Sequence, residues 1–130
     1  MRALVVDDSR AMRRIVARTL TELGFEIAEA GDGQQALDVL AAGPKPDLAC
    51  IDWNMPVMDG LTFVTKVRER AEWRDITLMM VTTESEHGQI VRALAAGAHE
   101  YLIKPFTPDS LREKLEMLGL VSWYDESGVV

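Results

Sequence analysis

Carboxylates, a hydroxyl and an ammonium follow four short apolar runs of this 130-residue chain, each at the point where the run ends. In chain order they are Asp7 and Asp8 after ALVV, Asp52 after DLACI, Thr82 after ITLMMV, and Lys104 after YLI. Clustered carboxylates repel one another unless a cation neutralises them, and hard divalent ions such as Mg²⁺ prefer oxygen ligands. A carboxylate beside such an ion can attack a phosphoryl group and form an aspartyl phosphate. Brought together, these side chains would make Asp52 a candidate phosphoacceptor, with charge on the phosphoryl oxygens met by metal, ammonium and hydroxyl.

The elements that must bring these side chains together alternate along the chain. Five strand-like runs are each followed by a segment with helical periodicity. The runs are residues 3–6, 25–30, 47–51, 76–81 and 101–103. Such alternation predicts one α/β domain, a parallel sheet with helices on both faces and right-handed crossovers. Ligands bind such sheets at the carboxyl ends of the strands where strand order reverses, so an order of 2-1-3-4-5 would bring Asp7, Asp8 and Asp52 into one crevice.

Capping and helix-breaking residues mark the helix boundaries. The first helix is expected from Ser9 to Leu23 and ends before Gly24, as a helix followed by a C′ glycine would. Its apolar stripe is expected to contain Met12, Ile15, Val16, Leu20 and Leu23. The arginines at positions 10, 13, 14 and 18 lie mostly off that stripe and are interpreted as a solvated face, with a docking surface for an acidic partner as the alternative. The other boundary residues are Gly43 and Gly97 after the second and fourth helices, Asp59-Gly60 before the third, and Thr107-Pro108 at the start of the fifth.

The bulk composition narrows the classes of partner. The chain has 14 Lys and Arg against 21 Asp and Glu, a net charge of -7, which disfavours nucleic acid and anionic membranes. Cys50 is the single cysteine, so an internal disulfide is impossible and a small core residue in a reducing compartment is expected. The N-terminus lacks the apolar region of a signal peptide, and no run is long enough to span a bilayer. We expect a cytoplasmic monomer.

Four motifs together resemble one known family. VVDDS, CIDWNMPVMDG, MMVTTES and EYLIKPF are similar to the receiver domain of bacterial response regulators over residues 2–118, and most of all to its stand-alone chemotaxis type. The resemblance implies a flavodoxin-like (βα)5 fold of strand order 2-1-3-4-5. It also implies a receiver domain at residues 1–119 and a short C-terminal tail at 120–130, with no output domain.

The resemblance implies a role for each residue of the site. As metal ligands it implies Asp8, Asp52 and the Asn54 backbone carbonyl directly on Mg²⁺, and Asp7 through water. The catalytic set would be Asp52 as phosphoacceptor, Thr82 and Lys104, with Thr82 and Tyr101 as the switch residues. Asn54 and Glu84 would tune dephosphorylation, and the bond between Lys104 and Pro105 would be cis.

The function implied is a signalling switch in chemotaxis or related signalling. Asp52 would accept a phosphoryl group from a sensor histidine kinase, in a reaction that the receiver itself catalyses without being an enzyme of separate substrates. The output would be a protein-binding face on the fourth helix, fifth strand and fifth helix, for a target such as the flagellar motor switch, or for a phosphatase. The fourth helix lacks the lysine pair that the resemblance implies for a motor binder, which argues against that target.

Other functions on the same architecture remain as alternatives. A phosphate sink or relay intermediate without an output target would use the same chemistry. An aspartyl-phosphate phosphatase would need a D-x-D arrangement after the first strand, where this chain has DDSR. A flavin carrier would need an anion-binding loop there, and two aspartates would repel phosphate. Trp53, directly after Asp52, is expected at the rim of the crevice and would report on it, whereas Trp73 and Trp123 lie elsewhere.

Overall fold

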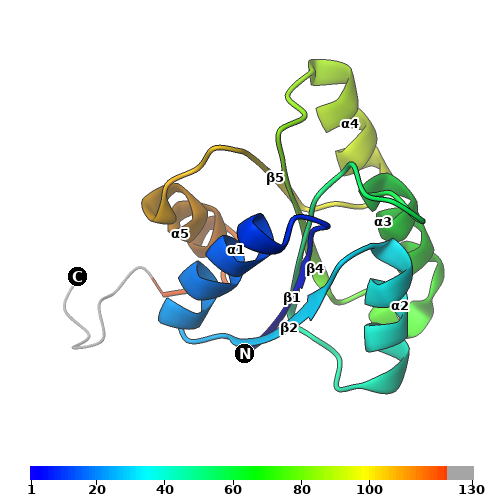
Figure 1. Ribbon diagram of the computed structural model, residues 1–130, viewed down its shortest axis with the longest axis horizontal. Helices are drawn as coiled ribbons and strands as arrows, with labels where there is room; N and C mark the ends of the chain where they lie inside the picture. Colours follow the sequence, from blue (N-terminus) through cyan, green and yellow to red (C-terminus); the bar gives the residue numbers. More distant parts are fainter. Residues whose placement is uncertain (123–130) are drawn as a thin grey trace.

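The computed structural model describes residues 1–122 and contains a five-stranded parallel sheet between two layers of helices (Figure 1). The strands are β1 (Arg2–Val6), β2 (Glu26–Ala30), β3 (Leu48–Ile51), β4 (Thr77–Thr82) and β5 (Glu100–Ile103). Their order in the sheet is β2-β1-β3-β4-β5. The flavodoxin-like α/β fold expected from the sequence is therefore confirmed.

Helices cover both faces of the sheet. They are α1 (Arg10–Glu22), α2 (Gly33–Ala42), α3 (Gly60–Glu69), α4 (His87–Ala96) and α5 (Pro108–Met117), with a short 3-10 helix at Ala71–Trp73. In Figure 1, α1 and α5 lie on one side of the strands and α2, α3 and α4 on the other. Two apolar clusters fill the spaces between these layers and the sheet. Within residues 1–122, no helix has both the length and the apolar character needed to cross a membrane.

The helix boundaries follow the sequence signals closely. Four helices begin after a residue whose side chain accepts a backbone N–H of the first turn; these residues are Ser9, Asp32, Asp59 and Thr107. Gly24 and Gly97 follow α1 and α4 with φ angles of 96° and 123°, a region that glycine adopts without steric cost. The Lys104–Pro105 bond is cis, as the resemblance implied.

The apolar stripe expected on α1 is wrong at one position. Ile15 is 51% exposed, whereas Val16, Ala17 and Leu20 are buried against the sheet. Successive residues of a helix are rotated by about 100°, so the residue before Val16 lies at the margin of the buried face. An apolar residue type at a marginal position is not distinguished from a core residue by periodicity alone.

Burial of the central strands fixes the position of the site. Every residue of β3 is buried, including Cys50, whose thiol pKa is raised to about 12 by burial. Such a thiol stays protonated and acts as a small apolar side chain, as expected from the sequence. Because β1 and β3 are adjacent and buried, the residues that follow them emerge together at one edge of a rigid layer.

Candidate functional site

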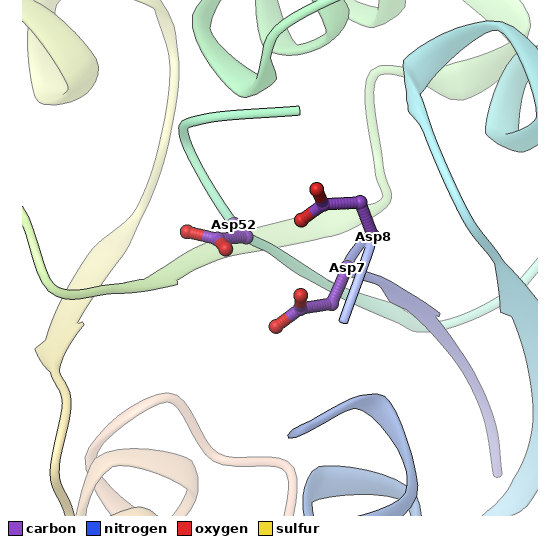
Figure 2. A group of neighbouring side chains, drawn as sticks. All are labelled: Asp7, Asp8 and Asp52. Atoms are coloured by element: carbon purple, nitrogen blue, oxygen red, sulfur yellow. The ribbon is translucent and has the colours of Figure 1, made fainter. Parts of the chain in front are cut away.

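Three carboxylates meet at the carboxyl ends of β1 and β3. Val6 pairs with Ile51 in the parallel register, so Asp7 and Asp52 follow side by side. Asp7, Asp8 and Asp52 each offer one oxygen, and these oxygens all lie within 4.8 Å of one another. Figure 2 shows the side chains together, Asp7 and Asp8 from one strand end and Asp52 from the other. Asp7 is buried, Asp52 is partly buried and Asp8 is exposed, so the cluster opens to solvent on the Asp8 side.

A lysine ammonium reaches this cluster from the end of β5. Lys104 Nζ lies 2.6 Å from Asp7 Oδ2 and 3.4 Å from Asp52 Oδ2. The Lys104 backbone N–H donates to the Thr82 carbonyl at 2.8 Å, which keeps the lysine aligned with the end of β4. The other Asp7 oxygen, Oδ1, accepts the Ser9 N–H at 2.9 Å. Both oxygens of Asp7 are therefore occupied, which suits an aspartate that acts on a metal indirectly.

The charges and donor types of the cluster fit a hard divalent cation. Three carboxylates against one ammonium leave two formal negative charges uncompensated. Within residues 1–122, no group donates a hydrogen bond to the Asp8 carboxylate or forms an ion pair with it. Carboxylate oxygens are the preferred ligands of Mg²⁺, and a dication removes the excess charge. The acidic cluster thus has the composition of a receiver magnesium site.

The loop between Asp52 and α3 is shaped by a glycine that the sequence analysis interpreted only as part of a turn. A Cβ on Gly60 would lie 2.1 Å from the Asp52 carbonyl oxygen, so no other residue fits there without displacement. The Gly60 N–H donates to the Trp53 carbonyl at 2.7 Å, and the Asp52 N–H donates to the Val6 carbonyl at 2.9 Å. Gly60 therefore lets the start of α3 pack directly against the backbone of the candidate phosphoacceptor.

Glu84 links three of the expected site residues. Its side chain accepts the amide N–H of Asn54, its backbone N–H donates to Thr82 Oγ1 at 3.3 Å, and its carbonyl accepts the Tyr101 hydroxyl at 2.6 Å. Thr82 and Tyr101 are buried. Burial, followed by the charges of Glu84 and Asp52, raises the pKa of Tyr101, so its hydroxyl stays a donor at neutral pH. The resemblance implied only a dephosphorylation role for Glu84; its backbone contacts had no sequence signal.

Trp53, expected at the rim of the crevice, is a buried residue. It is 6% exposed and packs in the apolar cluster beneath α3 and α4. The Arg92 guanidinium of α4 lies 5.9 Å from the centre of its ring, within range of a cation–π contact. Trp53 still follows Asp52 directly, so its backbone adjoins the acidic cluster. Trp73 is buried in the 3-10 helix, and Trp123 lies outside the described residues.

A flavodoxin-like sheet with an acidic crevice and a lysine at its strand reversal defines a receiver-type phosphoacceptor architecture. Residues 3–116 match the family model described as the response regulator receiver domain, and the chain belongs to that family. It is thus a phosphoacceptor and not an enzyme with a separate substrate.

Individual relatives are similar over nearly the whole chain. The chemotaxis protein CheY1 of Helicobacter pylori is 45% identical over 119 residues, which cover 91% of this chain and 96% of the relative. The solved structure of the chemotaxis response regulator CheY4 of Vibrio cholerae has a TM-score of 0.83 at 36% identity, covering 90% of this chain and 97% of that one. The receiver domain of the Pseudomonas aeruginosa sensor histidine kinase PA1611, described with a magnesium ion coordinated in its active-site cleft, has a TM-score of 0.80 at 26% identity, covering 89% and 94%.

Proposed function

We propose that this chain is a phosphorylation switch of chemotaxis or related signalling, with Asp52 as the residue that accepts the phosphoryl group. The observation that carries the proposal is the meeting of Asp7, Asp8 and Asp52 beside the Lys104 ammonium. Relatives that are themselves named chemotaxis proteins support the choice of pathway. The donor is a phosphohistidine on a sensor histidine kinase, the receiver unit is residues 1–119 followed by a tail at 120–130, and the compartment is the cytoplasm.

The transfer exchanges one bond to phosphorus for another. The bond between phosphorus and the donor imidazole nitrogen breaks as a bond to an Asp52 carboxylate oxygen forms. The imidazole nitrogen keeps the electron pair of the broken bond and takes up a proton from solvent. Lys104 Nζ, already 3.4 Å from Asp52 Oδ2, donates to the incoming phosphoryl oxygens, and the Thr82 hydroxyl at the end of β4 donates to another.

Asp8, Asp52 and the Asn54 carbonyl are the groups that would hold Mg²⁺ directly, with Asp7 acting through water. The ion, when bound, supplies positive charge to the carboxylates and to the phosphoryl oxygens. Asn54 and Glu84, whose side chains are hydrogen-bonded to each other, shape the access of the water that later hydrolyses the aspartyl phosphate. This pair would set the lifetime of the signal.

The output is a protein-binding face formed by α4, β5 and α5. The exposed large apolar side chains on these three elements are Val91 and Leu94 of α4, Ile103 of β5 and Met117 of α5, with 49%, 44%, 41% and 74% of each residue accessible. Thr82 and Tyr101 would transmit the state of Asp52 to this face, because both contact the Glu84 segment that leads into α4. A target protein or a phosphatase that recognises the phosphorylated form would bind here.

The chemistry is tested by intact mass after incubation with Mg²⁺ and acetyl phosphate. We expect the gain of one phosphoryl group, its removal by hydroxylamine, and no gain in Asp52→Asn. Asp38→Asn, which removes a carboxylate from the exposed side of α2, is the matched control and should be phosphorylated like the parent. Undiminished labelling of Asp52→Asn would reject Asp52 as the acceptor.

A separate experiment distinguishes a switch from a phosphate sink. Beryllofluoride, which mimics the phosphoryl group on an aspartate, is added to the parent and to Asp52→Asn, and proteins bound by each are compared. A switch retains partners that bind only the activated parent. A phosphate sink would capture the same set of proteins in both.

A further inference from the structure

Asp8 is the member of the acidic cluster whose side chain is not held by a hydrogen bond or an ion pair within residues 1–122. Lys104 and the Ser9 N–H hold the two Asp7 oxygens, whereas no group within residues 1–122 bonds to the Asp8 carboxylate. The direction of the Asp8 side chain is therefore set by the backbone on either side of it. On the C-terminal side, Ser9 is fixed as the N-cap of α1.

On the N-terminal side, the backbone is held by Arg13. Arg13 Nη1 donates to the Asp7 carbonyl oxygen at 2.8 Å. That oxygen belongs to the peptide group that joins Asp7 to Asp8. Because a peptide group is planar, holding its oxygen fixes the orientation of the whole group, including the nitrogen of Asp8. Arg13 lies in the first turn of α1, and only 19% of its side chain is exposed.

Glu29 of β2 holds the guanidinium in this position. Arg13 Nε donates to Glu29 Oε1 at 3.0 Å, on the same planar group that binds the Asp7 carbonyl. Glu29 pairs with Val5 of β1 in the sheet, and the Asp7 N–H donates to the Ala30 carbonyl at 3.1 Å. The loop that carries Asp8 is thus braced by α1 on one side and by β2 on the other. Glu29 also offsets the positive charge that Arg13 brings close to the proposed cation site.

We propose that Arg13 is a positioning residue for the metal ligand Asp8, and that Glu29 locks Arg13 in its bridging geometry. The inference rests on the proposed Mg²⁺ site but assigns to it two residues that do not touch the ion. It goes against the interpretation of the α1 arginines as a uniform solvated face, because Arg10, Arg14 and Arg18 have no such contact within residues 1–122. The proposal also predicts a change in Mg²⁺ affinity that is opposite in sign to the change expected from simple electrostatics. Removing a positive charge near a cation site should strengthen cation binding, whereas loosening a ligand should weaken it.

The test is a Mg²⁺ titration followed by the amide NMR shifts of residues around the crevice. The variants are Arg13→Met, Arg13→Lys and the double variant Arg13→Met with Glu29→Met, each first shown to be fully folded by circular dichroism. Arg13→Lys keeps the charge but has one nitrogen in place of the planar fork. The double variant keeps the net charge of the parent. Arg14→Met, an exposed arginine of the same turn, is the matched control for a lost charge.

We expect the dissociation constant for Mg²⁺ to rise roughly tenfold in all three variants, the lower end of the effect of groups that orient metal ligands. Arg14→Met should bind as tightly as the parent or slightly more tightly. Equal or tighter binding by Arg13→Met, or rescue by Arg13→Lys to the affinity of the parent, would overturn the positioning role. Absence of Mg²⁺ binding by the parent would instead overturn the proposed metal site itself, and the inference with it.

Discussion

The close approach of α3 to the phosphoacceptor strand makes Gly60→Ala the sharpest test of how the site is built. The added methyl carbon would lie 2.1 Å from the Asp52 carbonyl oxygen, where ordinary contact begins at 3.4 Å, so the two must separate by about 1.3 Å. The backbone of Asp52 cannot move away, because its N–H is hydrogen-bonded to the Val6 carbonyl and the preceding residue, Ile51, is fully buried. The start of α3 must therefore move outward.

The cost of that movement can be worked from its parts. Overpacking in a rigid site costs about 1–3 kcal/mol, and loss of the 2.7 Å hydrogen bond from Gly60 to the Trp53 carbonyl costs about 1 kcal/mol more. Alanine offsets about 1 kcal/mol through its better helix propensity. The free energy of unfolding should thus fall by roughly 2 kcal/mol, a large share of the ~5–15 kcal/mol typical of a domain.

Chemical denaturation of the parent and two glycine variants checks this value. Gly88→Ala is the matched control, because Gly88 lies in the first turn of α4 and a Cβ there would meet nothing within 4 Å. The free energy of unfolding of the control should rise by up to about 1 kcal/mol, so the two substitutions should change the free energy of unfolding in opposite directions. Gly60→Ala should also bind Mg²⁺ more weakly than Gly88→Ala does. A Gly60→Ala protein as stable as the Gly88→Ala protein would refute the close contact.

Three further predictions concern the hydrogen-bond network, a histidine and the tryptophan. Thr82→Ala should still be phosphorylated at Asp52 but lose the gain in target affinity, because the Thr82 hydroxyl links the site to the Glu84 segment; unchanged activated binding would contradict this. His99 Nδ1 accepts the Leu78 N–H at 3.1 Å, and burial followed by the charge of Arg68 lowers the pKa of His99. Because the folded protein favours the neutral ring, His99 contributes to the free energy of unfolding above its unfolded pKa near 6.5, and this contribution is lost as the pH falls below that value. Denaturation midpoints should therefore drop toward pH 5 more in the parent than in His99→Gln. Tryptophan emission should change saturably with Mg²⁺, and Trp53→Phe should abolish the change while Trp73→Phe keeps it; a full response in Trp53→Phe would exclude Trp53 as its source.

The secondary structure was predictable because its signals are local. Apolar runs located every strand to within one residue, and the caps at Ser9 and Thr107 were readable as residue types. The order of the strands in the sheet could not be predicted from these local signals. Alternation alone requires a parallel sheet but permits several orders, and the order found came from the resemblance of four motifs to a family.

The parts of the site that sequence missed are made by backbone atoms. Gly60 resembles any turn glycine until the Asp52 carbonyl is seen beside it. Glu84 contributes an N–H and a carbonyl that every residue has, and Arg13 was indistinguishable from three neighbouring arginines until the Asp7 carbonyl was located. The burial of Trp53 was not predictable for a related reason, since adjacency to Asp52 in the chain fixes the position of its backbone but not the direction of its ring.

The charges at the crevice imply an order in which ligands arrive. Three carboxylates outnumber the one ammonium, so a negatively charged phosphoryl group meets repulsion unless a cation has first removed the excess. Lys104 alone cannot do this, because its shortest contact, 2.6 Å, is with Asp7 and its contact with Asp52 is 3.4 Å. The same asymmetry leaves the ammonium suited to the next step of the proposed function. It has three donors, and with one held by Asp7 the others remain for the phosphoryl oxygens that Asp52 would gain. Arg13 is consistent with this order because Glu29 neutralises its positive charge. The loop that carries Asp8 is therefore held in place without a further uncompensated cation that would compete with the metal.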